Sequence, residues 1–478
     1  MKHKIYRIVY TALCCAPLLA TAQTSEKITS PQRLYEEGRN LFQQKAFAAA
    51  MSPLHTFVKQ LNAEGNPLFA AGDKEEAEYM LVCAEYELRS PNSIELLRSY
   101  LDVYPDTPHA NRIYTLIASA YFFEGKYDEA LAMFNSARLD LLSNEERDDM
   151  TYRLATCFLK TGNVKEAAIW FETLRSTGSK YAADCTYYLS YIRYSQQRYE
   201  DALSGFLSLQ DNTKYKTLVP YYIAEIYLIK KNYDKAEIVA QNYLSAYPNQ
   251  KYTGEMYRIQ STADYHSGKY HEAAEAFNRY LKDNVESTRR RDALYMLGMS
   301  YYQTGVYSQV PVILGEVTTD NDALTQNAYL HMGLAYLQLA DRNKARMAFE
   351  QAAASDADQK IKEQASYNYA LCIHETSYSA FGESVTVFEH FLNEFPNSVY
   401  ADKVSNYLVE VYMNTRSYDA ALKSIERIAR PGKAILEAKQ KILFQLGTQS
   451  FANTQFEQAI NYFNQSILLP CIPARQVC

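Results

Sequence analysis

Small and apolar residues recur along the chain with a spacing that predicts pairs of amphipathic helices. In the clearest copies an aromatic residue is followed three positions later by a small residue, here called the anchor; weaker copies place Ala167, Val310, Ala345 and Ser384 at the same point. An apolar residue, usually Phe, follows four positions after that, as in Tyr199, Ala202 and Phe206. Residues four apart lie on one face of a helix, so the anchor and the Phe share a buried face. The anchors are Ala50, Ala130, Ala167, Ala202, Ala236, Ala273, Val310, Ala345, Ser384, Ala421 and Ala459, with Ser93 as a further copy.

A second helix is predicted before each anchor. Twelve positions before the anchor stands a small residue, such as Ala118, Ala224 or Gly333, and nine before it often stands Tyr or Phe. Short turns such as Thr161-Gly162-Asn163 separate the two segments. The pattern therefore predicts a helical hairpin in which small residues let the two helices approach closely. No single hairpin can bury its apolar face alone, so we expect the hairpins to stack.

One stretch carries the fullest copy of the repeat and resembles a known family. Residues 329–336 read Tyr-Leu-His-Met-Gly-Leu-Ala-Tyr and are followed by Ala345 and Phe349. This copy resembles the tetratricopeptide repeat (TPR), and the resemblance extends over about residues 31–470. The mean step between anchors from Ala130 to Ala459 is about 36.6 residues, longer than the family's 34. We therefore predict an all-α, right-handed superhelical solenoid of about twelve TPR-like hairpins without β-sheet.

A further motif resembles one bacterial branch of the family. Tyr-Leu-Asp-Val-Tyr-Pro at 100–105 recurs as Tyr-Leu-Ser-Ala-Tyr-Pro at 243–248 and as Phe-Leu-Asn-Glu-Phe-Pro at 391–396. This looks like the envelope subgroup that includes the outer-membrane assembly lipoprotein BamD, also called YfiO. The chain departs from BamD in its larger number of repeats and in lacking a well-placed Cys for lipid attachment.

The two ends of the chain differ from the repeat array. Residues 1–22 begin with Lys2, Lys4 and Arg7, continue with a mostly apolar stretch, and end in Ala20-Thr21-Ala22, which is typical of a secretory signal peptide. We expect the array to cover residues 23–470 and an irregular tail to cover residues 471–478. The tail lacks an end-cap helix, which leaves two alternatives: a complete chain or a truncated one. The leader predicts an exported protein, periplasmic or held at the outer membrane by a partner.

Composition excludes several classes of function. The net charge is −6, from 49 basic and 55 acidic residues, so no basic excess is present to bind nucleic acid. Nucleotide-loop, zinc-protease, serine-hydrolase and calcium-loop motifs are absent from the sequence. We therefore predict no enzyme activity, cofactor or metal. The run Arg289-Arg290-Arg291 is interpreted as a solvated helix face, with an acidic-partner or anionic-lipid patch as the alternative. Scattered cysteines such as Cys83, Cys157 and Cys372 are interpreted as small buried packing residues.

The 43 tyrosines suggest where a partner binds. In the TPR family, side chains fifteen and eleven positions before the anchor point into the concave groove. The resemblance places these residues there: Tyr152, Tyr187, Tyr191, Tyr221, Glu225 and Tyr295, and Tyr367 if a two-residue insertion is allowed in its hairpin. Tyrosine offers rigid contact area with a polar tip, as protein-binding surfaces do. The alternative is that these rings pack between repeats.

Together these observations predict a non-catalytic protein–protein interaction scaffold of the bacterial cell envelope. Its partners would be envelope proteins, without a direct membrane span and without nucleic acid. Two alternatives stay open: a glycan- or peptidoglycan-associated binding module, and the regulatory part of a larger enzyme.

Overall fold

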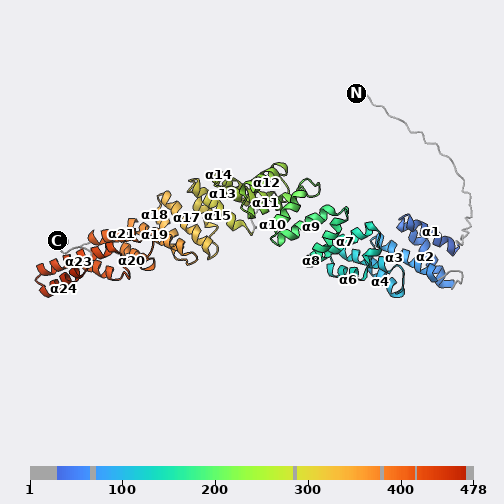
Figure 1. Ribbon diagram of the computed structural model, residues 1–478, viewed down its shortest axis with the longest axis horizontal. Coiled ribbons are helices and arrows are strands. Elements are labelled where there is room, and N and C mark those ends of the chain that lie inside the picture. The colour runs from blue at the N-terminus through green and yellow to red at the C-terminus, as the bar shows by residue number, and fades with distance from the viewer. Residues whose placement is uncertain (1–29, 65–70, 284–287, 377–381, 415–416, 470–478) are drawn as a thin grey trace, which may run out of the picture. The chain divides into compact units, whose positions relative to one another are not determined.

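The computed structural model describes residues 30–64, 71–283, 288–376, 382–414 and 417–469 (Figure 1). The predicted signal peptide and the predicted tail lie outside these ranges. Within them the chain contains α-helices, one short 3-10 helix at Leu139–Leu141, and no strand. The all-α prediction is confirmed.

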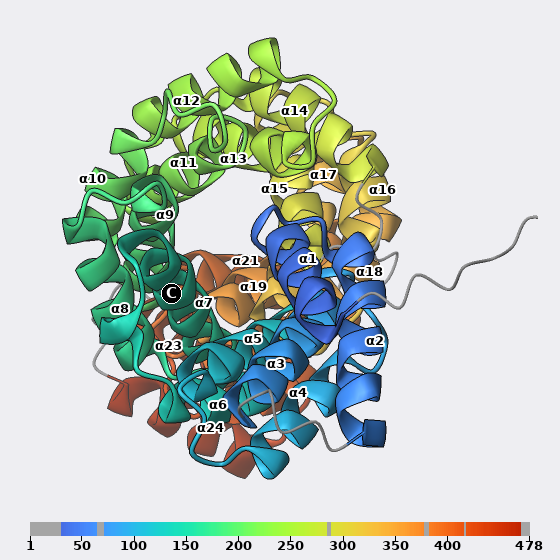
Figure 2. The same ribbon diagram turned by 90° about the vertical axis from the view of Figure 1, so that its right-hand side faces the viewer.

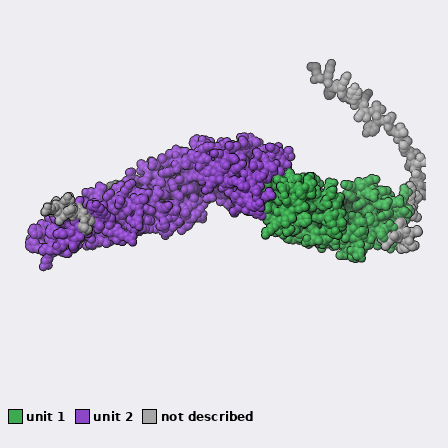
Figure 3. Space-filling model, viewed as in Figure 1, with its two compact units in different colours: residues 1–192 green, residues 193–478 purple. Residues whose placement is uncertain are grey.

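The chain divides into two compact units, residues 1–192 and 193–478 (Figure 3). The first unit contains α1 Pro31–Gln43, α2 Phe47–Glu64, α3 Ala71–Glu87, α4 Ser93–Val103, α5 Ala110–Phe123, α6 Tyr127–Ser136, α7 Asn144–Lys160, α8 Val164–Ser176 and most of α9 Ala182–Ser195. The second contains α10 Tyr199–Ser208, α11 Val219–Ile229, α12 Tyr233–Ala246, α13 Thr253–His266, α14 Tyr270–Asp283, α15 Arg290–Gln303, α16 Val310–Gly315, α17 Ala323–Gln338, α18 Arg342–Ala353, α19 Gln359–Thr376, α20 Glu383–Glu394, α21 Ala401–Asn414, α22 Tyr418–Glu426, α23 Lys433–Ala452 and α24 Phe456–Leu468.

These helices follow one another as the predicted hairpins. Each odd-numbered helix is a first helix and the next even-numbered one is its second helix, which gives twelve pairs over the described ranges. Of the twelve anchors, Ser93 is 8% exposed and the other eleven are at most 1% exposed. The register read from the sequence is therefore confirmed.

In nine of the hairpins the turn contains one residue with positive φ at a fixed position. It stands five positions before the anchor in nine hairpins: Lys45, Gly125, Gly162, Gln197, Lys231, Gly268, Gly305, Ala340 and Thr454. At Lys231, for example, the residue's N–H donates to Leu228 O and the next N–H donates to Tyr227 O. A left-handed residue with these two bonds ends a helix and satisfies its last carbonyl groups. The same backbone geometry thus reverses the chain whether or not glycine occupies the position.

Close approach within a hairpin requires the small residue of the first helix. A Cβ added at Gly333 would lie 2.5 Å from the Phe349 ring, and one at Gly298 would lie 2.4 Å from Leu314. Both neighbours stand four positions after their anchors. The small residue therefore contacts the large side chain one helical turn after the anchor, rather than only the anchor itself.

Stacked rings connect successive hairpins. The Phe after the anchor lies against a Tyr of the next first helix, as in Phe171–Tyr188 at 5.0 Å and Phe206–Tyr222 at 4.9 Å between ring centroids. Their ring planes differ by 14° and 9°. Aromatic pairs add to the free energy gained by burial alone. Many of the tyrosines thus serve the contact between repeats.

Helices that pack extensively against each other are either consecutive in the chain or separated by one helix. Within each unit the first helices lie on the inner side of its curve, as α11, α13 and α15 do in the second unit, and the second helices lie on the outer side (Figure 2). No helix among the described residues is long and apolar enough to cross a bilayer. This arrangement gives each unit an inner surface formed by first helices and an outer surface formed by second helices.

Candidate protein-binding surfaces

Three tyrosines of the predicted groove stack on the next hairpin. Tyr152 lies 4.3 Å from Tyr181, Tyr221 lies 4.8 Å from Tyr252, and Tyr367 lies 4.2 Å from Tyr400, measured between ring centroids. The planes of the three pairs differ by 9°, 19° and 10°. Each groove tyrosine is half-buried. One face of each ring is therefore occupied by an aromatic ring that belongs to the same chain.

The remaining predicted tyrosines differ in exposure. Tyr295 is half-buried against the core formed by α14, α15 and α16, and burial raises its pKa to about 12. Tyr187 is half-buried with an edge contact to Tyr188, whereas Tyr191 is 39% exposed. Tyr191 thus presents the most accessible ring of the set. Contact of these residues with a partner stays a prediction.

Glu225 is buried in an ion-pair network. Its carboxylate is 3% exposed and accepts bonds from the Arg258 guanidinium at 2.5 Å and from Arg289 at 2.8 Å. Arg258 also pairs with Glu255 at 2.6 Å. A buried charge requires such partners. The network connects α11, α13 and the start of α15, and it already neutralises the charge that Glu225 would offer a basic partner.

The arginine run after residue 288 is used within the fold. Arg289 bonds to Glu225, Arg290 pairs with Glu316 at 3.2 Å, and Arg291 binds both carboxylate oxygens of Asp322 at 2.5 and 2.6 Å. The Arg291 hydrogen bond is the main cause that lowers the pKa of Asp322. Arg289 is exposed, and Arg290 and Arg291 are half-buried, so the interpretation of the run as a solvated helix face stays a prediction, although all three guanidinium groups bond to carboxylates of the chain.

The first unit contains a hollow on its inner side that none of the seven predicted groove residues lines. This inner hollow has a volume of about 580 Å³ and lies among the turn after α3, helix α5 and helix α7. Leu116 and Met150 contribute apolar surface, and the Phe123 ring is 70% exposed. The guanidinium of Arg153 lies 4.9 Å from the centre of the Phe123 ring. The hollow therefore combines an accessible aromatic ring with a positioned cation.

Both signs of charge surround the inner hollow. Arg112 pairs with Glu146 at 3.0 Å, and Asp149 also lines the hollow. Ser119 stands eleven positions before its anchor, where other hairpins carry larger side chains, and it accepts a hydrogen bond from Arg153. The short side chains of Ser119 and Ala120, with arginines on two successive first helices, are the sequence features that could have indicated this site.

The described cysteines have the properties of packing residues. Cys83, Cys157, Cys185 and Cys372 are buried and are not joined by disulfides. Burial raises the pKa of the first three thiols to about 12 and that of Cys372 to about 11. A thiol with such a pKa is protonated and a poor nucleophile. Across the described ranges, no group of three or more His, Cys, Asp or Glu residues is arranged to hold a metal ion.

Comparison with family models agrees with the repeat geometry. A model described as tetratricopeptide repeat matches residues 115–182 and 260–308, and a second model with that description matches residues 326–359. These segments of the chain therefore match tetratricopeptide repeats, in agreement with the helical hairpins that the structure shows there. No curated protein sequence matches the chain.

Several solved structures resemble the chain at low identity. A tetratricopeptide repeat protein from Parabacteroides merdae is 16% identical, with a TM-score of 0.36 over 54% of this chain and 99% of its own. The C-terminal part of a TPR repeat-containing protein from Cytophaga hutchinsonii is 15% identical, with a TM-score of 0.38 over 52% of this chain and 97% of its own. The Cut9–Hcn1 complex of the APC/C is 13% identical, with a TM-score of 0.26 over 94% of this chain and 95% of its own.

Proposed function

We propose that this protein is a non-catalytic scaffold of the bacterial cell envelope that holds a segment of a partner protein in the inner hollow of its first unit. The tetratricopeptide repeats support a role in protein binding. The observation that carries the location is the exposed Phe123 ring beside Arg153 in a concave site of about 580 Å³. Aromatic and arginine side chains in a recess are typical of the residues that dominate binding energy at protein interfaces.

The stacked tyrosines favour protein binding over glycan binding. The Tyr152, Tyr221 and Tyr367 rings each have one face against another ring, so that face is closed to a sugar. Among the six tyrosines of the predicted groove, Tyr191 is the most exposed, at 39%. The tyrosine register therefore contributes chiefly to packing, and the inner hollow provides the binding contacts.

Capture from envelope extract tests the location of the site. Wild-type protein should retain a partner, which mass spectrometry identifies. Phe123→Ala and Arg153→Met should each weaken that binding, by about tenfold if either residue contributes about 1.4 kcal/mol. The exposed Phe451→Ala is the matched control in the second unit and should bind as wild type does. Equal capture by all variants would refute the inner hollow as the site.

The location in the cell requires a separate test, because it rests on residues 1–22 and on the motif at 100–105. Fractionation of cells that express the natural gene should place the protein in the periplasm or with the outer membrane. The N-terminal residue of the recovered protein should be Gln23. A cytosolic protein that retains its first 22 residues would refute the envelope role and leave the interaction role standing.

A further inference from the structure

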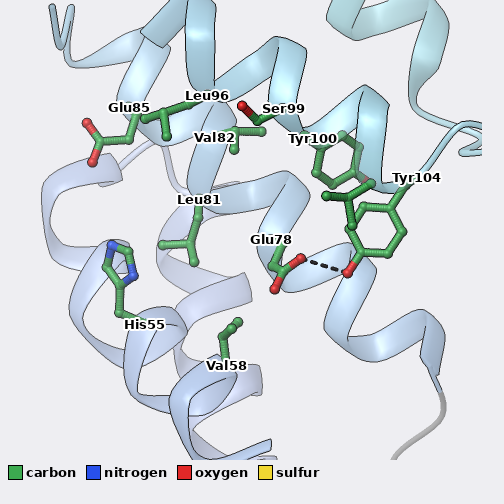
Figure 4. Close-up of a pocket in the computed structure, with 11 residues that line it drawn as sticks. His55, Val58, Glu78, Leu81, Val82, Glu85, Leu96, Ser99, Tyr100 and Tyr104 are labelled. Carbon is green, nitrogen blue, oxygen red and sulfur yellow. Dashed lines mark hydrogen bonds between the residues drawn. The ribbon is translucent and has the colours of Figure 1, made fainter. Parts of the chain in front are cut away.

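A second cavity lies on the outer side of the first unit, between the second helices α2 and α4 (Figure 4). This outer pocket has a volume of about 380 Å³. Helix α3 forms its floor with Leu81 and Val82, while Val58 of α2 and Leu96 of α4 form opposite walls. The inner hollow also borders α3 and the start of α4, but no lining residue is common to the two sites, so each can be altered by variants of its own.

The surface of the outer pocket is largely aliphatic and reachable. Leu81 is 7% exposed at the floor, whereas Leu96 is 38% exposed and Val103 is 64% exposed at the edge. Burial of such side chains against a ligand is favourable in proportion to the apolar area removed from water. The pocket is therefore suited to one or two large apolar side chains.

Negative charge accompanies this aliphatic surface. Glu78 and Glu85 of α3 line the pocket from two positions two helical turns apart, and none of the eleven lining residues is Lys or Arg. The Tyr104 hydroxyl donates to Glu78 at 2.6 Å, and the Ser90 hydroxyl donates to Glu85, so both carboxylates are held in place. Lys74, one helical turn before Glu78 and outside the pocket lining, forms a long ion pair with Glu78 at 3.8 Å. The remaining ionisable lining groups are His55 and two tyrosines.

We propose that the outer pocket binds a protein segment that inserts a Leu- or Phe-sized side chain and carries Lys or Arg beside it. The apolar side chain would fill the space over Leu81 and Val82, and the flanking cations would meet Glu78 and Glu85. Charge complementarity of this kind selects the partner and sets the register of its segment. The inference does not depend on the inner hollow. It gives the first unit a second contact, on the face opposite to the one proposed above.

Methyl NMR of the full chain, labelled at Ile, Leu and Val, can test the outer pocket with defined probes. The probes are the acetylated hexapeptides Gly-Lys-Leu-Phe-Lys-Gly, Gly-Glu-Leu-Phe-Glu-Gly and Gly-Lys-Ser-Ser-Lys-Gly. The first should shift the methyl resonances of Val82, Leu96 and Val103 saturably below about 1 mM. The acidic and serine peptides should bind at least about tenfold more weakly.

Matched variants locate the binding. Ser99→Trp should fill the pocket from its exposed wall and abolish the shifts, whereas Ser208→Trp, at an exposed serine in the second unit, should leave them unchanged. The double variant Glu78→Gln/Glu85→Gln should bind the basic and acidic peptides equally, and higher salt should weaken the basic peptide in wild type. Unchanged methyl resonances elsewhere would show that each variant folds.

Three results would overturn the proposal: no saturable shift with the basic peptide, equal binding of all three peptides, or unchanged binding to Ser99→Trp. Loss of the captured partner in Phe123→Ala with unchanged peptide binding would leave this proposal intact. The converse result would leave the inner hollow intact, so the two proposals fail separately.

Discussion

Single residues in this array tolerate unusual conformations where the repeat requires them. Lys231 has a φ of 57°, although non-glycine residues avoid this region because of contacts with Cβ. Gly125, Gly162, Gly268 and Gly305 occupy the same position without that strain. The free energy of unfolding is therefore lowered by strain at each non-glycine copy.

Lys231→Gly should relieve this strain and raise the free energy of unfolding by up to about 1 kcal/mol. The neighbouring Lys230, with a φ of −77°, gains nothing from glycine, so Lys230→Gly should be destabilising. Chemical denaturation of the three proteins, monitored by circular dichroism, measures the difference. Two variants that shift the transition in the same direction would contradict the strain argument.

One buried carboxyl group should make stability depend on pH. Asp264 is 1% exposed and stands nine positions before its anchor, where other hairpins often carry Tyr or Phe. Burial, and then the charge of Glu237, raise the pKa of Asp264 to about 7, while Lys269 opposes them. The folded protein therefore holds a proton on this group that the unfolded chain releases near pH 4.

Stability from Asp264 should accordingly be largest at low pH and fall as the pH rises from about 4 to 7. Asp264→Asn removes the titrating group. The free energy of unfolding of this variant should therefore change less between pH 4 and 7, and it should be larger than that of wild type at pH 8. The exposed Asp292→Asn is the control and should follow wild type. Parallel pH profiles for all three proteins would show that Asp264 is already ionised in the folded state.

The two helices of a hairpin contact each other through residues at fixed distances from the anchor. The glycine of a first helix and the large residue of its second helix leave no space for a Cβ. Buried amides add a second contact, since Gln326 donates to Ala352 O and Gln440 donates to Ser466 O at the end of each second helix. Both glutamines stand nineteen positions before their anchors. In these two hairpins the amide bond joins the start of the first helix to the end of the second, in addition to the contact at the glycine.

Gly333→Ala should destabilise its hairpin by about 1–3 kcal/mol, because the added methyl group would lie 2.5 Å from Phe349. Gly315→Ala is the matched control, since no atom other than those of its chain neighbours and its own helix backbone lies within 4 Å of its added Cβ. Thermal melting should separate the two variants. The reverse order would mean that Phe349 moves aside at little cost.

The Glu225 network should behave as a buried ion pair between hairpins. Glu225→Ala leaves the guanidinium of Arg258, which is 6% exposed, without its buried partner, and loss of one partner costs about 3–5 kcal/mol. The double variant Glu225→Leu/Arg258→Met should recover most of that loss, because no buried charge remains. Chemical denaturation of the single and double variants measures the coupling. A double variant less stable than the single one would refute this account.

At the scale of the whole chain, the repeat could be predicted from the sequence and the surfaces could not. The twelve hairpins could be predicted because each one carries its own anchor and turn residues, so the signal lies within a single hairpin. Tyr152, Tyr221 and Tyr367 stack on rings of the following hairpin. Counting positions along one helix cannot predict such a contact, because it depends on how the two hairpins pack. The inner hollow likewise arises where short side chains on α5 meet arginines on α5 and α7, without a motif.

Contacts limited to neighbouring helices should keep damage local. Ala273 is 0% exposed at the anchor of α14, and Ala273→Leu overpacks that contact at a cost of about 1–3 kcal/mol. Because stability in such arrays is a sum over repeats and their interfaces, only α13 to α15 should open more readily. Limited proteolysis should therefore cut first within residues 253–303, and hydrogen exchange should accelerate there while α23 and α24 stay protected.

Glu275→Leu adds the same side chain to the exposed face of α14 and should leave both measurements unchanged. Uniform acceleration across the second unit in Ala273→Leu would show that the repeats unfold together, contrary to the nearest-neighbour account.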